Sequence, residues 1–286
     1  MYLGNFIIFN CPNQYSIKLQ KIKLFLLFFV LSNTSSWSQL DYLVNSYKPT
    51  EYHSAPQVLS IAQDSNSIFY LGLKTGVLVF DGIRWEVLEV GDEQAVWSLK
   101  EERGRIYVGS DRDFGFLEQV DTVAAVFKSL APDSSVGRVE RILFDTKGKG
   151  YFQSSNQVYT YFDGKTESLN CVSAADEIFF CFLVEDTLYV QLKELGLQKL
   201  IGNKLEPIYT GFGLARNKIL AHTQFKGKHL LAVDGVGLLT GKNLDQLSPV
   251  NSLNFNINLI HALTPTSGNL LAVGTIGEGV YLLDAN

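Results

Sequence analysis

The chain has 286 residues, of which 46% are hydrophobic, and its formal net charge is −5 at pH 7. Its basic residues form no dense cluster, which argues against a nucleic-acid partner, because such a partner needs a basic face. After residue 38 no apolar run approaches the roughly 20 residues that a membrane-spanning helix needs.

Residues 1–38 are expected to be a secretory signal peptide that is cleaved before Gln39. The segment holds three lysines and no acidic residue, and its lysines precede an apolar run of eight residues, 24–31. An uncleaved anchor is the alternative, but eight residues are too few to cross a bilayer. The mature chain, 39–286, would carry a net charge of −8 and lie in the periplasm or outside the cell.

A phrase of short apolar strands recurs about every forty residues after residue 55. The glycine that opens the third strand is found at Gly76, Gly115, Gly196, Gly237 and Gly279. A period of this length made of strand-sized pieces is typical of a β-propeller. The prediction is an all-β propeller over 39–286, with about six four-stranded blades near 55–90, 91–132, 133–174, 175–217, 218–257 and 258–286.

Turn residues support this division into blades. Asp81-Gly82 and Asp163-Gly164 follow third strands two repeats apart, and Asp-Gly favours a type I′ hairpin because both residues need positive φ. The recurring aspartates, such as Asp64 and Asp145, are interpreted as turn formers. Trp85 is expected to pack on the outer strand of its blade.

The last repeat stops after its third strand, near 281–284. Residues 40–47 could supply the missing outer strand and close a six-bladed ring. The alternative is an incomplete seven-bladed ring whose remainder, including any membrane anchor, would lie beyond residue 286. An open ring would leave apolar strand edges and faces exposed.

Three cysteines are present, and only two of them follow the signal peptide. Cys171 and Cys181 are ten residues apart, in a compartment that permits disulfides. Cys181 lies inside an apolar run, so a buried thiol is the favoured interpretation and a disulfide the alternative.

Within the first two repeats the chain resembles the two-component-regulator propeller family. The resemblance rests on the phrases VLSIAQD at 58–64, FYLG at 69–72, GVLVFDG at 76–82 and Trp85, with a second copy from Val96 to Leu117. It is specific over 47–132 and becomes a bare repeat pattern beyond. It implies a propeller in the extracytoplasmic sensing part of a bacterial transmembrane regulator. The output domains of such receptors are not present in this sequence.

Propellers bind ligands where their innermost strands converge on the central channel. The first strand of each repeat is the innermost one, and residues on or beside these strands are the candidate ligand contacts: Trp97, Arg138, Arg141, His222 and His261. Aromatic and cationic groups suit a small polar or carbohydrate-like ligand, through ring stacking and charge-assisted hydrogen bonds.

Each candidate also has a structural explanation. Trp97 is favoured as an inter-blade packing residue. His222 and His261 lie near equivalent positions of adjacent blades and would simply be hydrogen-bonded. Arg138 and Arg141 flank Glu140, so local ion pairing would account for them.

The sequence contains no catalytic motif and no zinc-like spacing of cysteine and histidine. No catalytic residue, metal or cofactor is therefore predicted. The favoured function is a non-enzymatic, ligand-sensing propeller of a signalling receptor. A scaffold that binds another protein or self-associates, and a glycan hydrolase or lyase, are the alternatives.

Overall fold

The computed structural model describes residues 46–54, 56–119, 125–132, 136–170, 172, 175–209, 211–250, 260–266 and 269–284. Tyr47–Asn286 forms one compact unit, and this unit is the propeller. The expected signal peptide, 1–38, and most of the proposed closing strand, 40–47, lie outside the described residues.

The first three blades are four-stranded antiparallel sheets. Blade 1 consists of β1 (Ser60–Gln63), β2 (Phe69–Leu73), β3 (Gly76–Phe80) and β4 (Trp85–Leu88). Blade 2 consists of β5 (Val96–Glu102), β6 (Arg105–Ser110), β7 (Phe114–Gln119) and β8 (Ala125–Ser129). Blade 3 consists of β9 (Val139–Phe144), β10 (Gly150–Ser154), β11 (Val158–Phe162) and β12 (Lys165–Ser168).

The last three blades repeat this plan, except that the sheet of blade 6 has three strands in the described part of the chain. Blade 4 consists of β13 (Ile178–Val184), β14 (Thr187–Leu192), β15 (Gly196–Ile201) and β16 (Lys204–Pro207). Blade 5 consists of β17 (Ile219–Phe225), β18 (Lys228–Val233), β19 (Gly237–Gly241) and β20 (Ser248–Pro249). Blade 6 consists of β21 (Ile260–Pro265), β22 (Leu270–Thr275) and β23 (Gly279–Asp284).

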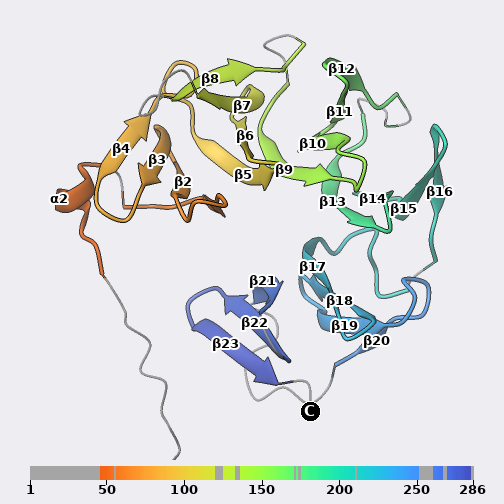
Figure 1. Cartoon of the computed structure of the whole chain (residues 1–286). Coiled ribbons are helices and arrows are strands. Elements are labelled where there is room, and N and C mark those ends of the chain that lie inside the picture. The colour runs from red at the N-terminus through yellow and green to blue at the C-terminus, as the bar shows by residue number, and fades with distance from the viewer. Residues whose placement is uncertain are drawn as a thin grey trace, which may run out of the picture. The chain divides into compact units, whose positions relative to one another are not determined.

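The six sheets succeed one another around a ring, with the first strand of each sheet innermost (Figure 1). Each innermost strand contacts that of the next blade, from β1 to β5, β9, β13, β17 and β21. The all-β fold and the six blades are therefore confirmed. The one helix in the described residues is a single turn, α2 (Pro49–Tyr52), ahead of blade 1.

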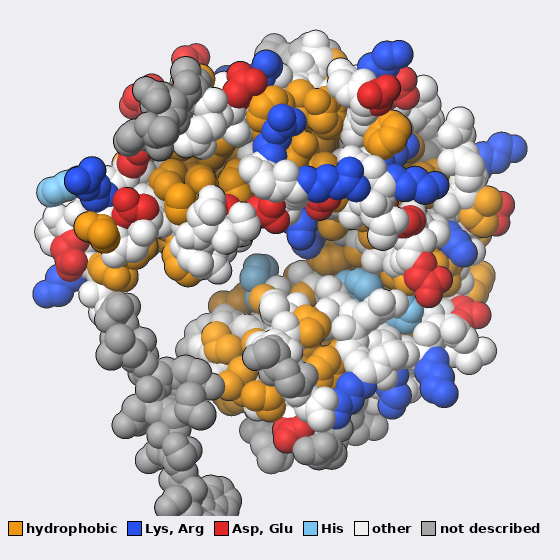
Figure 2. Space-filling model, in the orientation of Figure 1, with side chains coloured by type: hydrophobic (Ala, Val, Ile, Leu, Met, Phe, Trp, Pro, Cys, Tyr) orange, Lys and Arg blue, Asp and Glu red, His pale blue; other side chains and the backbone are white. Residues whose placement is uncertain are grey.

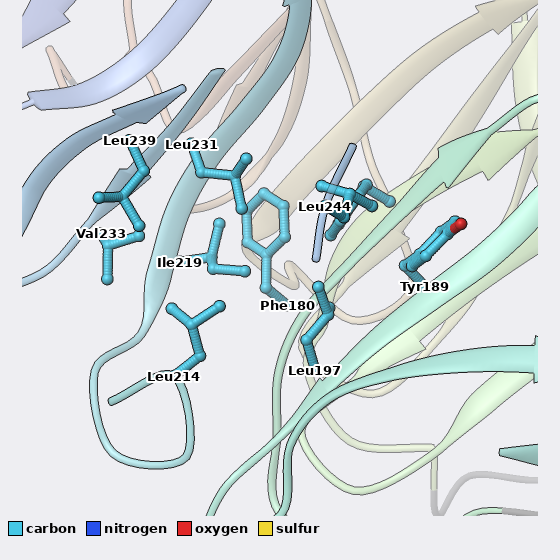
Figure 3. Close-up of a cluster of buried hydrophobic side chains, with 10 residues drawn as sticks. Phe180, Tyr189, Leu197, Leu214, Ile219, Leu231, Val233, Leu239 and Leu244 are labelled. Carbon is cyan, nitrogen blue, oxygen red and sulfur yellow. The ribbon is translucent and has the colours of Figure 1, made fainter. Parts of the chain in front are cut away.

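Apolar side chains from facing sheets form a separate core between each pair of adjacent blades. Between blades 4 and 5 Phe180, Leu197, Ile219, Leu231 and Leu239 are all at most 2% exposed (Figure 3). Alternate residues of a strand point to opposite faces, so one apolar run supplies two such cores. Burial on both faces of each sheet explains why the strands of the repeat are continuous apolar runs.

Polar contacts join neighbouring innermost strands in two ways. In blades 1 and 2 an innermost-strand serine donates to the next blade: Ser98 Oγ is 2.9 Å from the Val139 carbonyl oxygen. Opposite it lies Gly109, where a Cβ would collide with both Ser98 and Val139. The recurrent glycine near the end of the second strand is thus required for this close approach.

In blades 3 and 4 a buried glutamine on the second strand takes over the contact with the next blade. Gln153 Oε1 accepts from the Cys181 N–H at 2.9 Å, and Gln191 Oε1 accepts from the Ile219 N–H at 2.8 Å. Arg141 of blade 3 stands opposite Gln153, at the position of the inter-blade serine. This residue is therefore not needed for the inter-blade hydrogen bond.

The turn predictions hold in part. Asp163 and Gly164 both have positive φ, 49° and 73°, as a type I′ turn requires. The prediction was wrong at Asp81-Gly82, where a four-residue loop joins the strands and the Asp81 carboxylate accepts the N–H groups of Ile83 and Arg84. Such local hydrogen bonds give the chain a second way to turn.

Aspartates of other repeats act in the same way. Asp64 accepts the N–H groups of Asn66 and Ile68, and Asp145 those of Lys147 and Lys149. Their expected role as turn formers is confirmed.

Trp85 packs on its own blade, as expected, with its ring stacked on Phe80 at 4.0 Å between centroids. Tyr47 and Tyr52, from the segment ahead of blade 1, also contact the Trp85 ring. This aromatic cluster ties the start of the described chain to the outer strands of blade 1.

Cys181 is a buried free thiol, and burial raises its pKa to about 12. Such a thiol is inert under ordinary conditions. Cys171 lies outside the described residues.

Candidate functional site

A β-bulge recurs at one place in the innermost strands of blades 2 to 6. The strand register shifts there in β5, β9, β13, β17 and β21, so one residue of each strand has no pairing partner on the second strand of its blade. The residues skipped by the pairing are Trp97, Glu140, Phe179, Leu220 and His261. A bulge re-aims the side chain it carries, and the five bulge positions hold five different residue types.

Three of the five predicted site residues line one pocket among the innermost strands. Arg141 comes from β9, His222 from β17 and His261 from β21, so the pocket draws on blades 3, 5 and 6. Its volume is about 330 Å³. The remaining lining residues are Lys218, Ile219, Leu220, Ala221, Ala262 and Leu263. We call this cavity the channel pocket.

Arg141 is the charged centre of the channel pocket. Its guanidinium lies over the Phe180 ring of blade 4, with Cζ 3.7 Å from the ring centroid, a cation–π contact. Its Nε is sealed from solvent and has no hydrogen-bond partner, and it is the one such buried side-chain atom in the described part of the chain. Burial lowers the pKa of Arg141, and the nearby Cys181 and Glu140 oppose this shift.

His222 is held in the neutral form by its surroundings. Its Nε2 is 3.1 Å from Nδ1 of His229, so one of the two nitrogens donates and the other accepts. The ring also packs on Phe182 at 4.0 Å between centroids. Burial, then the neighbouring His229 and Arg141, lower the pKa of His222 to about 3.

His222 and His261 lie near equivalent positions of adjacent blades, as expected, but not at the same position. His261 is the bulge residue of β21, whereas the bulge residue of β17 is Leu220. His261 is exposed at the pocket, while His222 turns into the interface of blades 4 and 5. Both strands carry the bulge at the same place, so the two histidines are two positions apart: Leu220 matches His261, and His222 matches Leu263.

Trp97 and Arg138 form a separate cluster between blades 2 and 3. The Arg138 guanidinium lies over the Trp97 ring at 3.9 Å, and Trp97 Nε1 donates to Asp111 Oδ1 at 2.7 Å. Asp111 also faces Arg138, with 3.9 Å between Oδ1 and Nε. Trp97 therefore contacts the next blade, as the packing interpretation predicted, and the charges of this cluster compensate one another.

The ion pairing expected around Glu140 takes a different form. Glu140 Oε2 lies 3.6 Å from Nζ of Lys218, across the channel on blade 5. Arg138 is paired with Asp111, and no carboxylate in the described residues lies within ion-pair distance of Arg141. Strand neighbours alternate faces, so sequence adjacency gave the wrong partners here.

A larger groove, which the sequence analysis missed, lies between blades 4 and 5. Its volume is about 880 Å³, and Tyr189, Lys199, Lys226, His229 and Lys242 are among its lining residues. Two of its lysines are exposed surface side chains. Because these groups are solvated, the groove carries less evidence of a built site than the channel pocket does.

Among the described residues no three histidine, cysteine or acidic side chains are grouped so that they could hold a metal ion. In the same part of the chain, no helix is both long enough and apolar enough to cross a membrane.

The fold and the channel pocket define a β-propeller, a class in which binding modules and enzymes both occur. By sequence, no known protein family and no curated protein matches the chain. Three solved structures show what it resembles in fold.

The WD40 β-propeller domain of Doa1 matches with a TM-score of 0.62 and 14% identity, over 82% of this chain and 80% of that one. Virginiamycin B lyase from Staphylococcus aureus matches with a TM-score of 0.59 and 10% identity, over 80% and 84%. The extracellular domain of the putative hybrid two-component system BT3049 from B. thetaiotaomicron gives 0.51 and 16%. That match covers 83% of this chain but 41% of the other.

These likenesses establish the propeller fold. They include an extracellular domain of the receptor class that the first two repeats resemble, together with an enzyme and a WD40 domain. At such identities the fold alone does not decide between binding and catalysis.

Proposed function

We propose that this chain is a non-enzymatic, extracytoplasmic propeller that binds a small polar, carbohydrate-like ligand in the channel pocket, as the sensing part of a signalling receptor. The observation that carries the proposal is the convergence of Arg141, His222 and His261, from three different blades, on one pocket. Innermost strands that meet at a channel are where propellers place ligands.

The lining of the pocket suits such a ligand. Apolar positions such as Leu220 and Leu263 offer a surface for a sugar ring, while the exposed His261 offers ring nitrogens that bond hydroxyls. A volume of about 330 Å³ lies in the range of small-molecule sites.

The receptor context rests on two similarities. The phrases at 58–85 resemble the two-component-regulator propellers, and the extracellular domain of BT3049 shares the fold at a TM-score of 0.51. Both agree with a place outside the cytoplasm. The signal peptide expected at 1–38 points the same way.

A thermal-shift screen of neutral and acidic oligosaccharides with the full chain tests the proposal. A ligand at about 100 times its Kd should stabilise the protein by about 2.7 kcal/mol, a rise of several degrees in Tm. His261→Ala should abolish the rise. His53→Ala, on the lead-in to blade 1, is the matched control. A folded protein that responds to no glycan, or an unaltered response in His261→Ala, would contradict the proposal.

A further inference from the structure

The charge of Arg141 is uncompensated in the channel pocket. Its Nε is buried and has no partner, and no carboxylate in the described part of the chain forms an ion pair with it. Glu140, the adjacent acid, is directed to Lys218 at 3.6 Å. A buried charged donor without an acceptor is costly, and native proteins rarely retain one without a reason.

Arg138 shows what a compensated arginine looks like in the same molecule. It stacks on Trp97 as Arg141 stacks on Phe180, at 3.9 Å and 3.7 Å respectively. Arg138, however, also faces the carboxylate of Asp111. The Arg138 side chain is also 48% exposed, whereas Nε of Arg141 is buried and has no acceptor within the described chain.

The position of Arg141 supports the same conclusion. It occupies the place where blades 1 and 2 carry the serine that bonds the next blade, and Gln153 makes that bond in blade 3. A small residue at this position would therefore leave the hydrogen bond between blades 3 and 4 intact. The arginine is not explained by the hydrogen bonding between blades.

We propose that Arg141 binds the carboxylate of an acidic, hydroxylated ligand of monosaccharide size, such as a uronic acid. This inference rests on the proposed function and names the ligand class of that site. An arginine fork pairs with a carboxylate through two parallel hydrogen bonds, here from its two Nη groups, because Nε is sealed from solvent. Phe180 covers a face of the guanidinium, which leaves its edge for the ligand.

The charge and the volume of the channel pocket both favour this class of ligand. Glu140 pairs with Lys218, so Arg141 is the cation of the pocket that has no carboxylate partner, and a single such charge matches one carboxylate better than a phosphate dianion. A volume of about 330 Å³ gives room for a single sugar ring. The sugar hydroxyls then hydrogen-bond to His261, and the sugar ring packs on the apolar residues of the pocket.

Isothermal titration calorimetry of the full chain with matched probes tests the inference. The probes are glucuronate with glucose, galacturonate with galactose, and inorganic phosphate. At least one acid should bind about tenfold or more tightly than its neutral sugar, the size expected of a charge-assisted pair. Arg141→Gln should remove this preference. Arg141→Lys, which keeps the charge but not the fork, should lose about tenfold. Arg138→Gln is the matched control and should bind as the wild type does.

The outcomes separate the inference from the proposed function. Equal binding of acid and neutral sugar, or a preference that persists in Arg141→Gln, overturns the anion inference and leaves the binding function standing. If Arg141→Gln does not fold, Arg141→Lys decides, and unchanged affinity there overturns the inference. Phosphate binding as tightly as the uronate would overturn the choice of a carboxylate. If no sugar and no acid binds, both proposals fail.

Discussion

Blades 4 and 5 bury their facing sides against each other, whereas the outward sides of blades 1 and 6 stay exposed. Leu231 and Leu239, between blades 4 and 5, are 0% exposed. Ile61 in blade 1 and Leu282 in blade 6 are 61% and 52% exposed. Figure 2 shows hydrophobic side chains gathered over β22 and β23 on the exposed side of blade 6.

The same repeat pattern thus has two outcomes. An apolar strand residue is buried only where a neighbouring sheet covers it. Most of the stabilisation from apolar burial therefore comes from the interfaces between adjacent blades. The exposed sides of blades 1 and 6 are the flanks of the series, and we call them the exposed flanks. Substitutions of one chemical type should therefore differ widely in effect between the core of blades 4 and 5 and the exposed flanks.

The largest effect is expected for Leu231→Ala, in the core of blades 4 and 5. The side chain is fully buried among Phe180, Ile219 and Leu239, so truncation removes apolar contacts and leaves a cavity. The free energy of unfolding should fall by about 2–5 kcal/mol. Urea denaturation measures the change, and a loss below about 1 kcal/mol would contradict the packing of blades 4 and 5 described above.

Gln191→Leu should cost about 2–3 kcal/mol, because it leaves buried backbone groups without partners. The Gln191 amide donates to the carbonyl oxygens of Leu214 and Asn217 at 2.7 and 2.8 Å, and accepts from Ile219 N–H. The leucine is similar in size, so the loss reports the hydrogen bonds. Exposed Gln224→Leu is the matched control and should change stability by less than about 0.5 kcal/mol.

Acid should weaken the same interface through His222. The folded pKa is about 3, below the ordinary 6.5, so between these values the unfolded chain binds a proton that the folded chain does not. The stabilisation is complete above about pH 6.5 and is lost as the pH falls toward 3. Each pH unit in this window should lower the free energy of unfolding by up to about 1.4 kcal/mol.

Comparing pH slopes isolates this contribution from that of other groups. His222→Gln removes the group and should flatten the decline in stability between pH 6 and pH 4, as followed by urea denaturation at each pH. His53→Gln, an exposed histidine, should keep the slope of the wild type. Identical slopes in all three proteins would show that the interface does not exclude the proton.

The blades were predictable because their signals are local. Strand alternation, recurrent glycines and turn aspartates such as Asp64 and Asp145 act within about ten residues, and the structure places them as expected. The partners of the site residues are not local. Arg138 pairs with Asp111 of the preceding blade, and Glu140 pairs with Lys218, which lies two blades further along the chain.

The channel pocket could be predicted as a region but not in detail. Residues on innermost strands converge by topology, which gave Arg141, His222 and His261. His261 is itself the bulge residue of β21, whereas His222 lies two residues after the bulge of β17, and the apolar pattern does not show where a bulge lies. The compensation of Arg138 and the missing partner of Arg141 depend on side-chain directions, which periodicity does not specify.

The smallest effect is expected on the exposed flanks, where Leu282→Ala should change stability by less than about 0.5 kcal/mol. Leu282 is 52% exposed on β23, so truncation leaves no cavity and removes few contacts. Urea denaturation beside Leu231→Ala measures the contrast between two leucine truncations. A loss above about 2 kcal/mol in Leu282→Ala would show that this flank is covered in solution. Repeating the measurement over a hundredfold range of protein concentration then distinguishes cover by a second copy, which depends on concentration, from cover within one chain, which does not.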